Sequence, residues 1–320
     1  MPKFITDTIL MVRPVNFHFN EQTAVNNYYQ KVLDDLDPAE VQQRAQTEFD
    51  NFVAILRKNG VRVIVIEDTP YPETPDSIFP NNWVSFHADG RVGLYPMFAE
   101  NRRKERRADM FDKLGTEYSL KVTDKIDLTR FEDDGKYLEG TGSMVFDREN
   151  RIAYAALSER TDIDVLEEFC RSFDYKAVTF TAYQSVGQNR LPIYHTNVMM
   201  CVGDTFAVVC ADCIDDPDEK LKVIEVLEQT GKEIIYITED QVQQFAGNML
   251  QVRSYDTPEN KYLVMSEAAY QSLTEKQLNQ LQAHCEIIYS SLDTIEALGG
   301  GSARCMMAEV FLPASKTIKT

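Results

Sequence analysis

Runs of β-branched and aromatic residues alternate with amphipathic stretches along almost the whole chain. Residues 38–59 have helical spacing and lead into a strand pattern at 61–66, and the same order recurs at 217–230 and 233–237. Residues 198–209 contain two apolar runs around a Gly-Asp pair, which is a hairpin signal. This alternation predicts an α/β fold with a recurring hairpin, helix, strand unit, although no literal sequence repeat is visible.

Length and composition indicate one domain covering residues 1–320. Apolar residues make up 43% of the chain and charged residues 26%, which is ordinary for a globular protein with its own core. No Pro/Gly/Ser-rich stretch or block of charge divides the sequence, so we predict a single domain. The sequence leaves a homo-oligomer open.

Charge and hydropathy argue against two classes of partner. With 51 acidic and 33 basic residues, the net charge of −18 repels nucleic acid and anionic lipid. No stretch reaches the roughly 18 apolar residues of a membrane helix, and residues 1–7 lack the basic and apolar regions of a secretory signal. We therefore expect a cytoplasmic protein that binds neither nucleic acid nor membranes.

The six cysteines are spread through apolar surroundings, which suits a reducing compartment better than a disulfide scaffold. Cys210 and Cys213 have the spacing of a redox or zinc pair, but no second pair exists and the chain has four histidines. We therefore predict no metal and no other cofactor.

The heptapeptide 299–305, Gly-Gly-Gly-Ser-Ala-Arg-Cys, has the composition of an active-site loop. Consecutive glycines let the backbone take positive φ and approach a bound group closely. Residues 306–312 have the pattern of a closing strand, so the Cys305 thiol would be held rigidly yet remain reachable. The alternative is a glycine turn followed by a buried structural cysteine.

Three polar segments could supply partners for a thiolate. His195 begins a His-Thr-Asn triplet that interrupts apolar residues, and Glu139 lies between an apolar pair and two glycines. Histidine is the most frequent general acid and base, whereas a carboxylate can orient a substrate nitrogen or cap a turn. The third segment, 75–83, places the single tryptophan directly after two amides. A satisfied histidine at a strand edge is the alternative for His195.

Together these segments resemble the guanidino-group-modifying superfamily, which includes arginine deiminases, dimethylarginine dimethylaminohydrolases, amidinotransferases and succinylarginine dihydrolase. The resemblance covers residues 9–312, and its most specific element is the 299–305 ending. Leu-Glu-Gly at 138–140 and the Asp-x-x-Phe element at 76–79 also match. The resemblance implies a five-bladed α/β propeller of ββαβ modules with pseudo-fivefold symmetry.

The resemblance also implies roles for individual residues and a small amino acid as substrate. Cys305 attacks the central carbon of a guanidinium or ureido group, His195 transfers protons, and Glu139 binds substrate nitrogens, without a cofactor. Asp76 and Phe79 belong to the substrate-binding set.

Two arginines match elements that bind the substrate α-carboxylate in dimethylaminohydrolases. Arg102 lies in Asn-Arg-Arg-Lys-Glu, which is similar to their Ser-Arg-Arg-Lys-Glu, and Arg160 lies in a segment similar to their Leu-Ser-Lys-Arg-Thr. A planar guanidinium fork suits a carboxylate bidentately. Residues 101–114 have the spacing of one charged amphipathic helix. The alternative is that both arginines are solvated surface charges.

The chain departs from the family at the residues that would grip a guanidinium. Asn82 and Asn197 stand where arginine deiminases have aspartates, and Gly142 stands where many relatives have an aspartate. An asparagine offers donors as well as an acceptor, so it suits a neutral urea better than a cation. We therefore expect hydrolysis of citrulline to ornithine, carbon dioxide and ammonia. The alternatives are a deiminase or dihydrolase of arginine or a substituted arginine, and an amidinotransferase.

Overall fold

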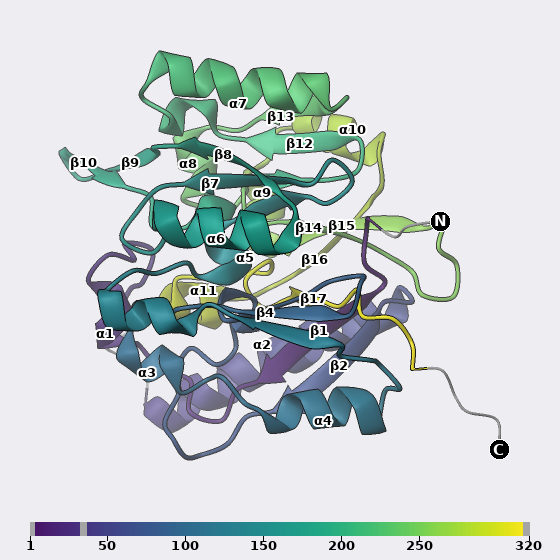
Figure 1. Cartoon of the computed structure of the whole chain (residues 1–320). Coiled ribbons are helices and arrows are strands. Elements are labelled where there is room, and N and C mark those ends of the chain that lie inside the picture. Colours follow the sequence, from purple (N-terminus) through teal and green to yellow (C-terminus); the bar gives the residue numbers. More distant parts are fainter. Residues whose placement is uncertain (1–3, 33–36, 316–320) are drawn as a thin grey trace.

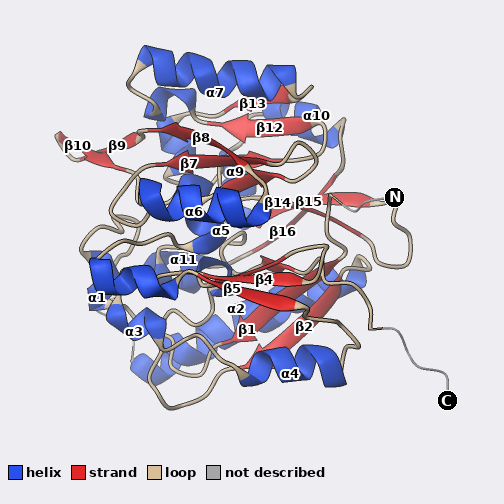
Figure 2. Ribbon diagram, viewed as in Figure 1, coloured by secondary structure: helices blue, strands red, loops and turns tan. Residues whose placement is uncertain are grey.

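The strands form five three-stranded sheets and one two-stranded hairpin within residues 4–32 and 37–315, which are the residues that the computed structural model describes (Figure 1). In all five three-stranded sheets the middle strand pairs antiparallel with one neighbour and parallel with the other. Helices α7 and α4 lie at opposite ends of the view in Figure 2, with the strands between them. The predicted α/β class is confirmed, and no sheet closes on itself in this part of the chain.

Each three-stranded sheet belongs to a unit that we call a module. A module consists of an antiparallel strand pair, a helical crossover and a third strand parallel to the middle one. Parallel strands require such a crossover, so the helices follow from the sheet pattern. The first three modules contain β17 (Ala308–Glu309), β1 (Thr8–Arg13), α2 (Pro38–Lys58) and β2 (Arg62–Glu67); β3 (Val84–Phe86), β4 (Arg91–Leu94), α3 (Glu100–Arg103), α4 (Asp109–Thr116) and β5 (Asp124–Asp127); and β6 (Val145–Asp147), β7 (Ile152–Ala156), α6 (Ile163–Phe173) and β8 (Lys176–Phe180).

The last two modules follow the same plan, and short elements connect the modules. The fourth and fifth modules contain β11 (Met200–Val202), β12 (Phe206–Val209), α7 (Pro217–Gln229) and β13 (Glu233–Tyr236); and β14 (Leu250–Arg253), β15 (Lys261–Ser266), α9 (Glu267–Ser272), α10 (Glu275–Gln282) and β16 (Glu286–Ser290). The connecting elements are α1 (Glu21–Ala24), α5 (Gly140–Ser143), the hairpin β9 (Tyr183–Val186) and β10 (Asn189–Pro192), α8 (Glu239–Val242), α11 (Asp293–Gly299), and 3-10 turns at Pro80–Asn82, Thr129–Asp134, Thr196–Val198 and Ala211–Cys213.

Neighbouring modules touch through the first strand of each. Strand β17 contacts β3, α5 contacts β3, β6 contacts β11, and β11 contacts β14. An isolated bridge from Thr6 to Val252 joins the fifth module to the first. The modules therefore contact one another in the cyclic order first to fifth and back to first.

The core lies between modules as well as within them. Helix α2 begins at Pro38, whose fixed φ suits a first helical position, and is capped by the Asp37 side chain, which accepts from Ala39 N–H. Its buried face, including Phe49 and Phe52, packs into one apolar cluster with residues of β14, β15 and β16. The first and fifth modules thereby share a core.

Two elements differ from the sequence expectation. The single helix predicted over 101–114 is two helices, α3 and α4, because only the second has an apolar face to bury, formed by Met110, Phe111 and Leu114. The closing strand predicted over 306–312 is the two-residue β17, because hydrogen bonds at 302–307 first form turns.

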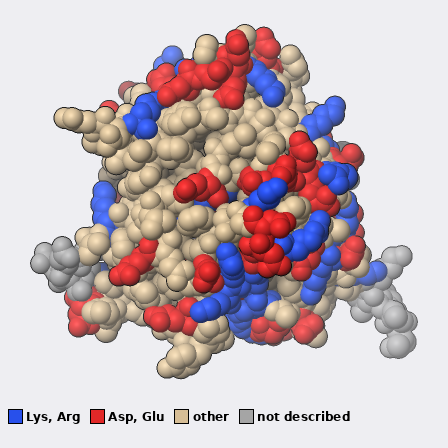
Figure 3. All heavy atoms as spheres, turned by 60° about the vertical axis from the view of Figure 1, so that its left-hand side comes forward, with Lys and Arg blue, Asp and Glu red and all other residues tan. Residues whose placement is uncertain are grey.

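No helix among the described residues is long and apolar enough to cross a membrane. Figure 3 turns the side carrying α1 and α3 forward, and shows acidic and basic side chains interspersed over part of this face and uncharged residues over most of the rest. The net negative charge is therefore not gathered into a single acidic patch on this face.

Candidate active site

The structure brings all nine predicted site residues together around one cavity of about 260 Å³. Glu139 and Asn197 lie behind its wall, hydrogen-bonded to His195 and Cys305 respectively. All nine are buried, so the alternative of solvated surface charges is wrong for both arginines. The residues of the set that line the cavity directly are Asp76, Phe79, Asn82, Arg102, Arg160, His195 and Cys305.

The modules deliver these residues from equivalent places. Asn82 ends the turn before β3, Glu139 caps α5 before β6, and Asn197 lies in the turn before β11. Cys305 lies in the turn before β17. Four modules thus each place a polar residue just ahead of their first strand, where the modules meet.

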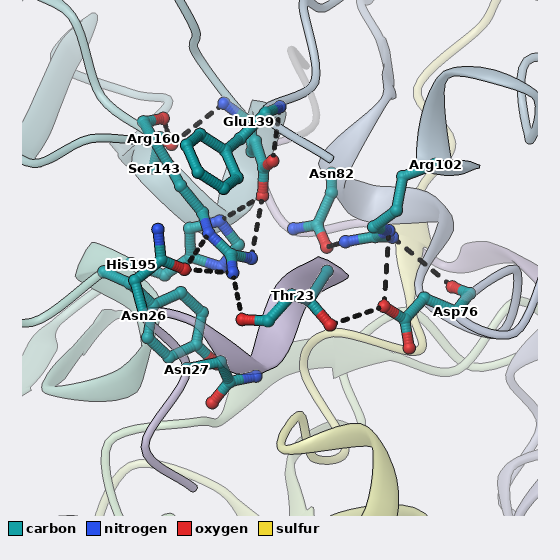
Figure 4. A network of polar contacts seen from close by, with 12 residues as sticks. Thr23, Asn26, Asn27, Asp76, Asn82, Arg102, Glu139, Ser143, Arg160 and His195 are labelled. Atoms are coloured by element: carbon teal, nitrogen blue, oxygen red, sulfur yellow. Dashed lines mark hydrogen bonds and ion pairs between the residues drawn. The ribbon is translucent and has the colours of Figure 1, made fainter. Parts of the chain in front are cut away.

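Glu139 and His195 form a buried pair in which the carboxylate holds the ring (Figure 4). His195 Nε2 lies 2.7 Å from Glu139 Oε2, and Glu139 Oε1 accepts from Phe98 N–H at 3.0 Å. Burial lowers the pKa of His195 to about 4, although Glu139 opposes this shift. Burial raises the pKa of Glu139, but Arg160 and His195 outweigh it and hold that pKa well below its usual range. The pair is therefore a carboxylate and a neutral imidazole, which donates Nε2–H and keeps Nδ1 as a proton acceptor.

Arg102 fixes the orientation of the Asn82 amide. Its Nη1 donates to Asn82 Oδ1 at 2.8 Å, while Nε and Nη2 donate to the two Glu105 carboxylate oxygens at 2.8 and 3.0 Å. A guanidinium has only donors, so the amide oxygen must face Arg102 and the NH₂ must face away. Asn82 Nδ2 is buried and has no partner among the described residues.

Arg160 connects the wall of the cavity to the segment that covers it, residues 20–31. Its Nη1 donates to Glu139 Oε2 at 3.4 Å, Nη2 to Thr23 O at 2.8 Å and Nε to Asn26 Oδ1 at 2.9 Å (Figure 4). Asn27 Nδ2 lies 3.3 Å from the carbonyl oxygens of both residues 299 and 300. The covering segment is therefore bonded to the wall of the cavity and to the glycine loop.

Both guanidinium forks are largely occupied within the protein. Arg102 Nη2 also donates to Asp76 O and Phe79 O, and Arg160 Nη2 also donates to Asn26 Oδ1. Each arginine therefore retains one N–H, on Nη1, without a partner in the described part of the chain. The bidentate grip expected for either arginine is therefore not available in this arrangement. Each arginine therefore has a single N–H left for a ligand in the cavity that both line.

Asp76 presents a second kind of group to the cavity. Its Oδ2 accepts from Asn20 Nδ2 at 2.7 Å and Thr23 Oγ1 at 3.2 Å, whereas its buried Oδ1 has no partner within the described residues. Burial raises the pKa of Asp76, which Arg102 opposes. Oδ1 is thus an acceptor available to a substrate N–H.

The glycine loop holds Cys305 from several sides. Gly300 has φ of 62°, a left-handed conformation that favours glycine, and its N–H donates to Glu296 O at 3.0 Å. Ser302 Oγ donates to Glu296 Oε1 at 2.5 Å, and Cys305 N–H donates to Ser302 O at 2.9 Å. Phe79 packs beneath the loop, since a Cβ at Gly299 would lie 2.7 Å from its ring. The thiol is buried, as the alternative supposed, but it also lines the cavity.

A family model supplies the identification. The model for N,N-dimethylarginine dimethylhydrolases of the eukaryotic type matches residues 13–312. The chain belongs to this dimethylarginine dimethylhydrolase family. The superfamily resemblance seen in the sequence is confirmed, and with it the expectation of a hydrolase acting on C–N bonds outside peptide bonds. No curated protein matches the chain.

Solved structures of similar fold include ArgZ, AgrE and a dimethylarginine dimethylaminohydrolase. The N-terminal domain of ArgZ, an arginine dihydrolase from cyanobacteria, is 18% identical with a TM-score of 0.69, over 95% of this chain and 97% of that one. AgrE, in complex with ornithine and NAD⁺, is 18% identical with a TM-score of 0.70, but this chain spans 39% of AgrE. A dimethylarginine dimethylaminohydrolase bound to S-methyl-L-thiocitrulline is 11% identical with a TM-score of 0.60, over 95% and 99%. At these identities the likeness concerns the fold.

Gly142, which departs from many members of the superfamily, has a structural explanation in this member of the dimethylarginine dimethylhydrolase family. A Cβ at Gly142 would lie 2.4 Å from Asn82 Nδ2 and 2.8 Å from His195 Nδ1. The backbone of Glu139 is held by Ser143 instead, since Glu139 N–H donates to Ser143 Oγ at 2.9 Å. The departure keeps space between two site residues and leaves Glu139 held.

Sequence reasoning missed two parts of this family member's site. Thr23, Asn26 and Asn27 are polar residues in an N-terminal segment, and nothing in their spacing indicates contact with residues more than a hundred positions away. Asn248 donates to Cys305 Sγ at 3.3 Å. The Gly-Asn pair at 247–248 signals a turn, which is compatible with a site residue but does not identify one.

No cluster of three or more His, Cys, Asp or Glu side chains that could hold a metal ion occurs in the described residues of this family member. Cys210 and Cys213 are both buried, at a turn in the fourth module.

Proposed function

We propose that the protein hydrolyses the ureido group of citrulline, releasing ornithine, carbon dioxide and ammonia. The orientation of Asn82 carries this proposal. Because Arg102 donates to Asn82 Oδ1, the NH₂ of Asn82 is the group left for the substrate. Two N–H donors suit the carbonyl oxygen of a urea and oppose the N–H groups of a guanidinium.

Asn197 supports the same substrate from the other side of the reacting carbon. Its Nδ2 lies 3.5 Å from Cys305 Sγ, and its buried Oδ1 has no partner within the described ranges. An amide oxygen beside the thiol can accept from a substrate N–H. Together the two asparagines offer a donor and an acceptor, which is the complement of a neutral ureido group.

The ends of an amino acid also find partners in the cavity. The remaining Nη1–H groups of Arg102 and Arg160 suit an α-carboxylate, and Asp76 Oδ1 suits an α-ammonium. These assignments give the α-carboxylate two cationic partners and the α-ammonium one anionic partner, and they place the two asparagine amides at the ureido end.

The reaction runs in two steps. Cys305 loses its proton to neutral His195 at Nδ1 and attacks the ureido carbon, and His195 returns the proton to the δ-nitrogen as the C–N bond to ornithine breaks. Water, deprotonated by His195, then attacks the S-carbamoyl group and releases carbamate, which decomposes to carbon dioxide and ammonia. One water is consumed for each citrulline. Glu139 holds His195 and keeps the imidazole in the required tautomer.

Arginine dihydrolysis is the second candidate, because Glu139 and Asn197 Oδ1 provide acceptors for a guanidinium beside His195 and Cys305. The fold similarity to ArgZ is compatible with it. An amidinotransferase would need room for a second substrate in the same cavity.

The deciding assay incubates the purified protein separately with citrulline, arginine, N-methylated arginine and agmatine. Ornithine, citrulline, ammonia and amines are then quantified over time. Ornithine and ammonia in equal amounts from citrulline support the proposal. Ornithine with two ammonias from arginine, and no turnover of added citrulline, would contradict it and favour the second candidate.

We also propose that the five modules are the blades of a five-bladed propeller with the cavity near its axis. The cyclic contacts between modules and the delivery of Asn82, Glu139, Asn197 and Cys305 from equivalent turns support this arrangement.

A further inference from the structure

Asn248 occupies, in the fifth module, the place from which the other four modules deliver site residues. It lies two residues ahead of β14, and its side chain is 1% exposed. No sequence motif singles out this residue. Its position completes the set of polar residues at the turns before the first strands.

Every hydrogen-bonding group of the Asn248 side chain is used around Cys305. One Nδ2–H donates to Cys305 Sγ at 3.3 Å and the other to Asn197 O at 3.1 Å. Oδ1 accepts from Arg304 N–H at 2.9 Å. The amide therefore bonds the sulfur, the backbone just before it, and the neighbouring turn that carries Asn197.

The backbone around Asn248 is built to hold this position. Phe245 has φ of 61°, an uncommon conformation for a bulky residue. A Cβ at Gly247 would lie 2.3 Å from Val198 O, so the turn packs directly against the fourth module. Asn248 N–H donates to Phe245 O at 2.8 Å. The turn therefore has little freedom to move the amide away from the sulfur.

We propose that Asn248 is a further catalytic residue, which places Cys305 Sγ and stabilises its thiolate by donating a hydrogen bond. With Asn197 Nδ2 at 3.5 Å, the sulfur has two amide donors and a thiolate can accept from both. Hydrogen bonds to the charged form of a group favour that form. This inference rests on the role of Cys305 in the proposed function.

The test measures the rate at which iodoacetamide alkylates Cys305 between pH 5 and 10, with the modified peptide identified by mass spectrometry. The thiolate is the reacting form, so the pH of half-maximal rate reports its stabilisation. Asn248→Asp keeps the size of the side chain and the acceptor for Arg304 N–H, but replaces the donor with a carboxylate oxygen. Asn248→Ala removes the donor without adding charge.

We expect the half-maximal pH to rise by about one unit or more in Asn248→Asp and by less in Asn248→Ala. The control Asn279→Asp makes the same change of charge at an exposed position on α10, and the half-maximal pH should stay at the value of the parent. With citrulline, kcat falls in both Asn248 variants while KM changes little. Thermal unfolding identifies which variants fold, and the Ala variant carries the test if the Asp variant does not.

Unchanged half-maximal pH in the folded variants, with Cys305 reactive in the parent, overturns the role of Asn248 alone. Absence of turnover of every ureido and guanidino substrate, or full activity without Cys305, overturns the proposed function instead. The two failures are thus distinguishable.

Discussion

The wall of the cavity and the segment that covers it are built in different ways. The wall residues Asn82 and Cys305 lie in turns closed by backbone hydrogen bonds, from Asn82 N–H to Phe79 O and from Cys305 N–H to Ser302 O. The covering segment, 20–31, contains a single turn of helix, α1, and exposes Val25 to 64%. It is fastened mainly by side-chain hydrogen bonds, by one backbone bond from Lys31 N–H to Ala297 O, and by one buried aromatic residue, Tyr29. We therefore expect local opening of the site to occur in the covering segment rather than in the wall.

The largest effect is expected in the wall. Cys305→Ala should lower kcat by about 10⁴-fold or more, because it removes the nucleophile. Steady-state kinetics with citrulline or the substrate found by the assay measures this loss. Cys170→Ala, in α6 and outside the cavity, is the matched control and should retain full activity. Turnover by Cys305→Ala at the parent rate would remove the nucleophile assignment.

Asn82→Asp tests the specificity of the wall. An aspartate still accepts from Arg102 but presents an acceptor in place of the amide donors. The ratio of kcat/KM for arginine to that for citrulline should rise by about 10- to 100-fold, which corresponds to exchanging one favourable hydrogen bond for an unfavourable contact. An unchanged ratio would contradict the complementarity between the Asn82 amide and a urea.

Glu296→Gln tests how the wall supports the glycine loop. Burial raises the pKa of Glu296 to about 7 from its ordinary 4.5. Because the folded state prefers the protonated form, this contribution to stability is present below about pH 4.5 and is lost as pH rises through about 7. Gln mimics the protonated acid and cannot ionise. Between pH 5 and 8.5 the unfolding free energy of Glu296→Gln should therefore fall by about 1 to 3 kcal/mol less than that of the parent.

Thermal or denaturant unfolding of the parent and of Glu296→Gln at both pH values measures this difference. Glu225→Gln, exposed on α7, is the control for loss of a surface carboxylate. If the unfolding free energies of the parent and of Glu296→Gln changed in parallel with pH, the raised pKa of Glu296 would be contradicted.

The smallest effect is expected in the covering segment. Asn26→Ala removes the amide oxygen that accepts from Arg160 Nε and Nη2, so the segment should open more often and KM should rise about 3- to 10-fold with kcat little changed. Hydrogen exchange of residues 20–31 should become faster. Asn16→Ala, which loses only a bond to Pro70 O, is the control. A fall in kcat with constant KM would place Asn26 in the wall chemistry rather than in the cover.

The fold class and the candidate site residues could be predicted from the sequence, whereas the contacts between modules and with the covering segment could not. Helix α2 and the β11–β12 hairpin follow from local periodicity and turn residues, so they could be recognised directly. The predicted helix over 101–114 is two helices because only α4 has an apolar face to bury, whereas Arg102 and Arg106 bind the carboxylates of Glu105 and Glu132. Local spacing carries no information about such partners.

The nine predicted site residues were selected from the superfamily motifs, and the structure gathers them around one cavity. Asn248 was not found because its role depends on contacts with Asn197 and Cys305, which lie 51 and 57 residues away. The covering segment was missed for the same reason, since Asn26 contacts Arg160 across 134 residues. Bonds between modules are set by tertiary packing, which no local pattern reveals.

Strand β17 pairs with β1, so residues near the two ends of the described chain complete one sheet. Cys305 lies three residues before β17 and contacts Asn248 of another module, so its surroundings exist only after the last module has joined the first. A folding intermediate with four modules in place would have its histidine and carboxylate but an unorganised thiol. The reactivity of this one sulfur is therefore a natural reporter of whether the ring of modules has closed.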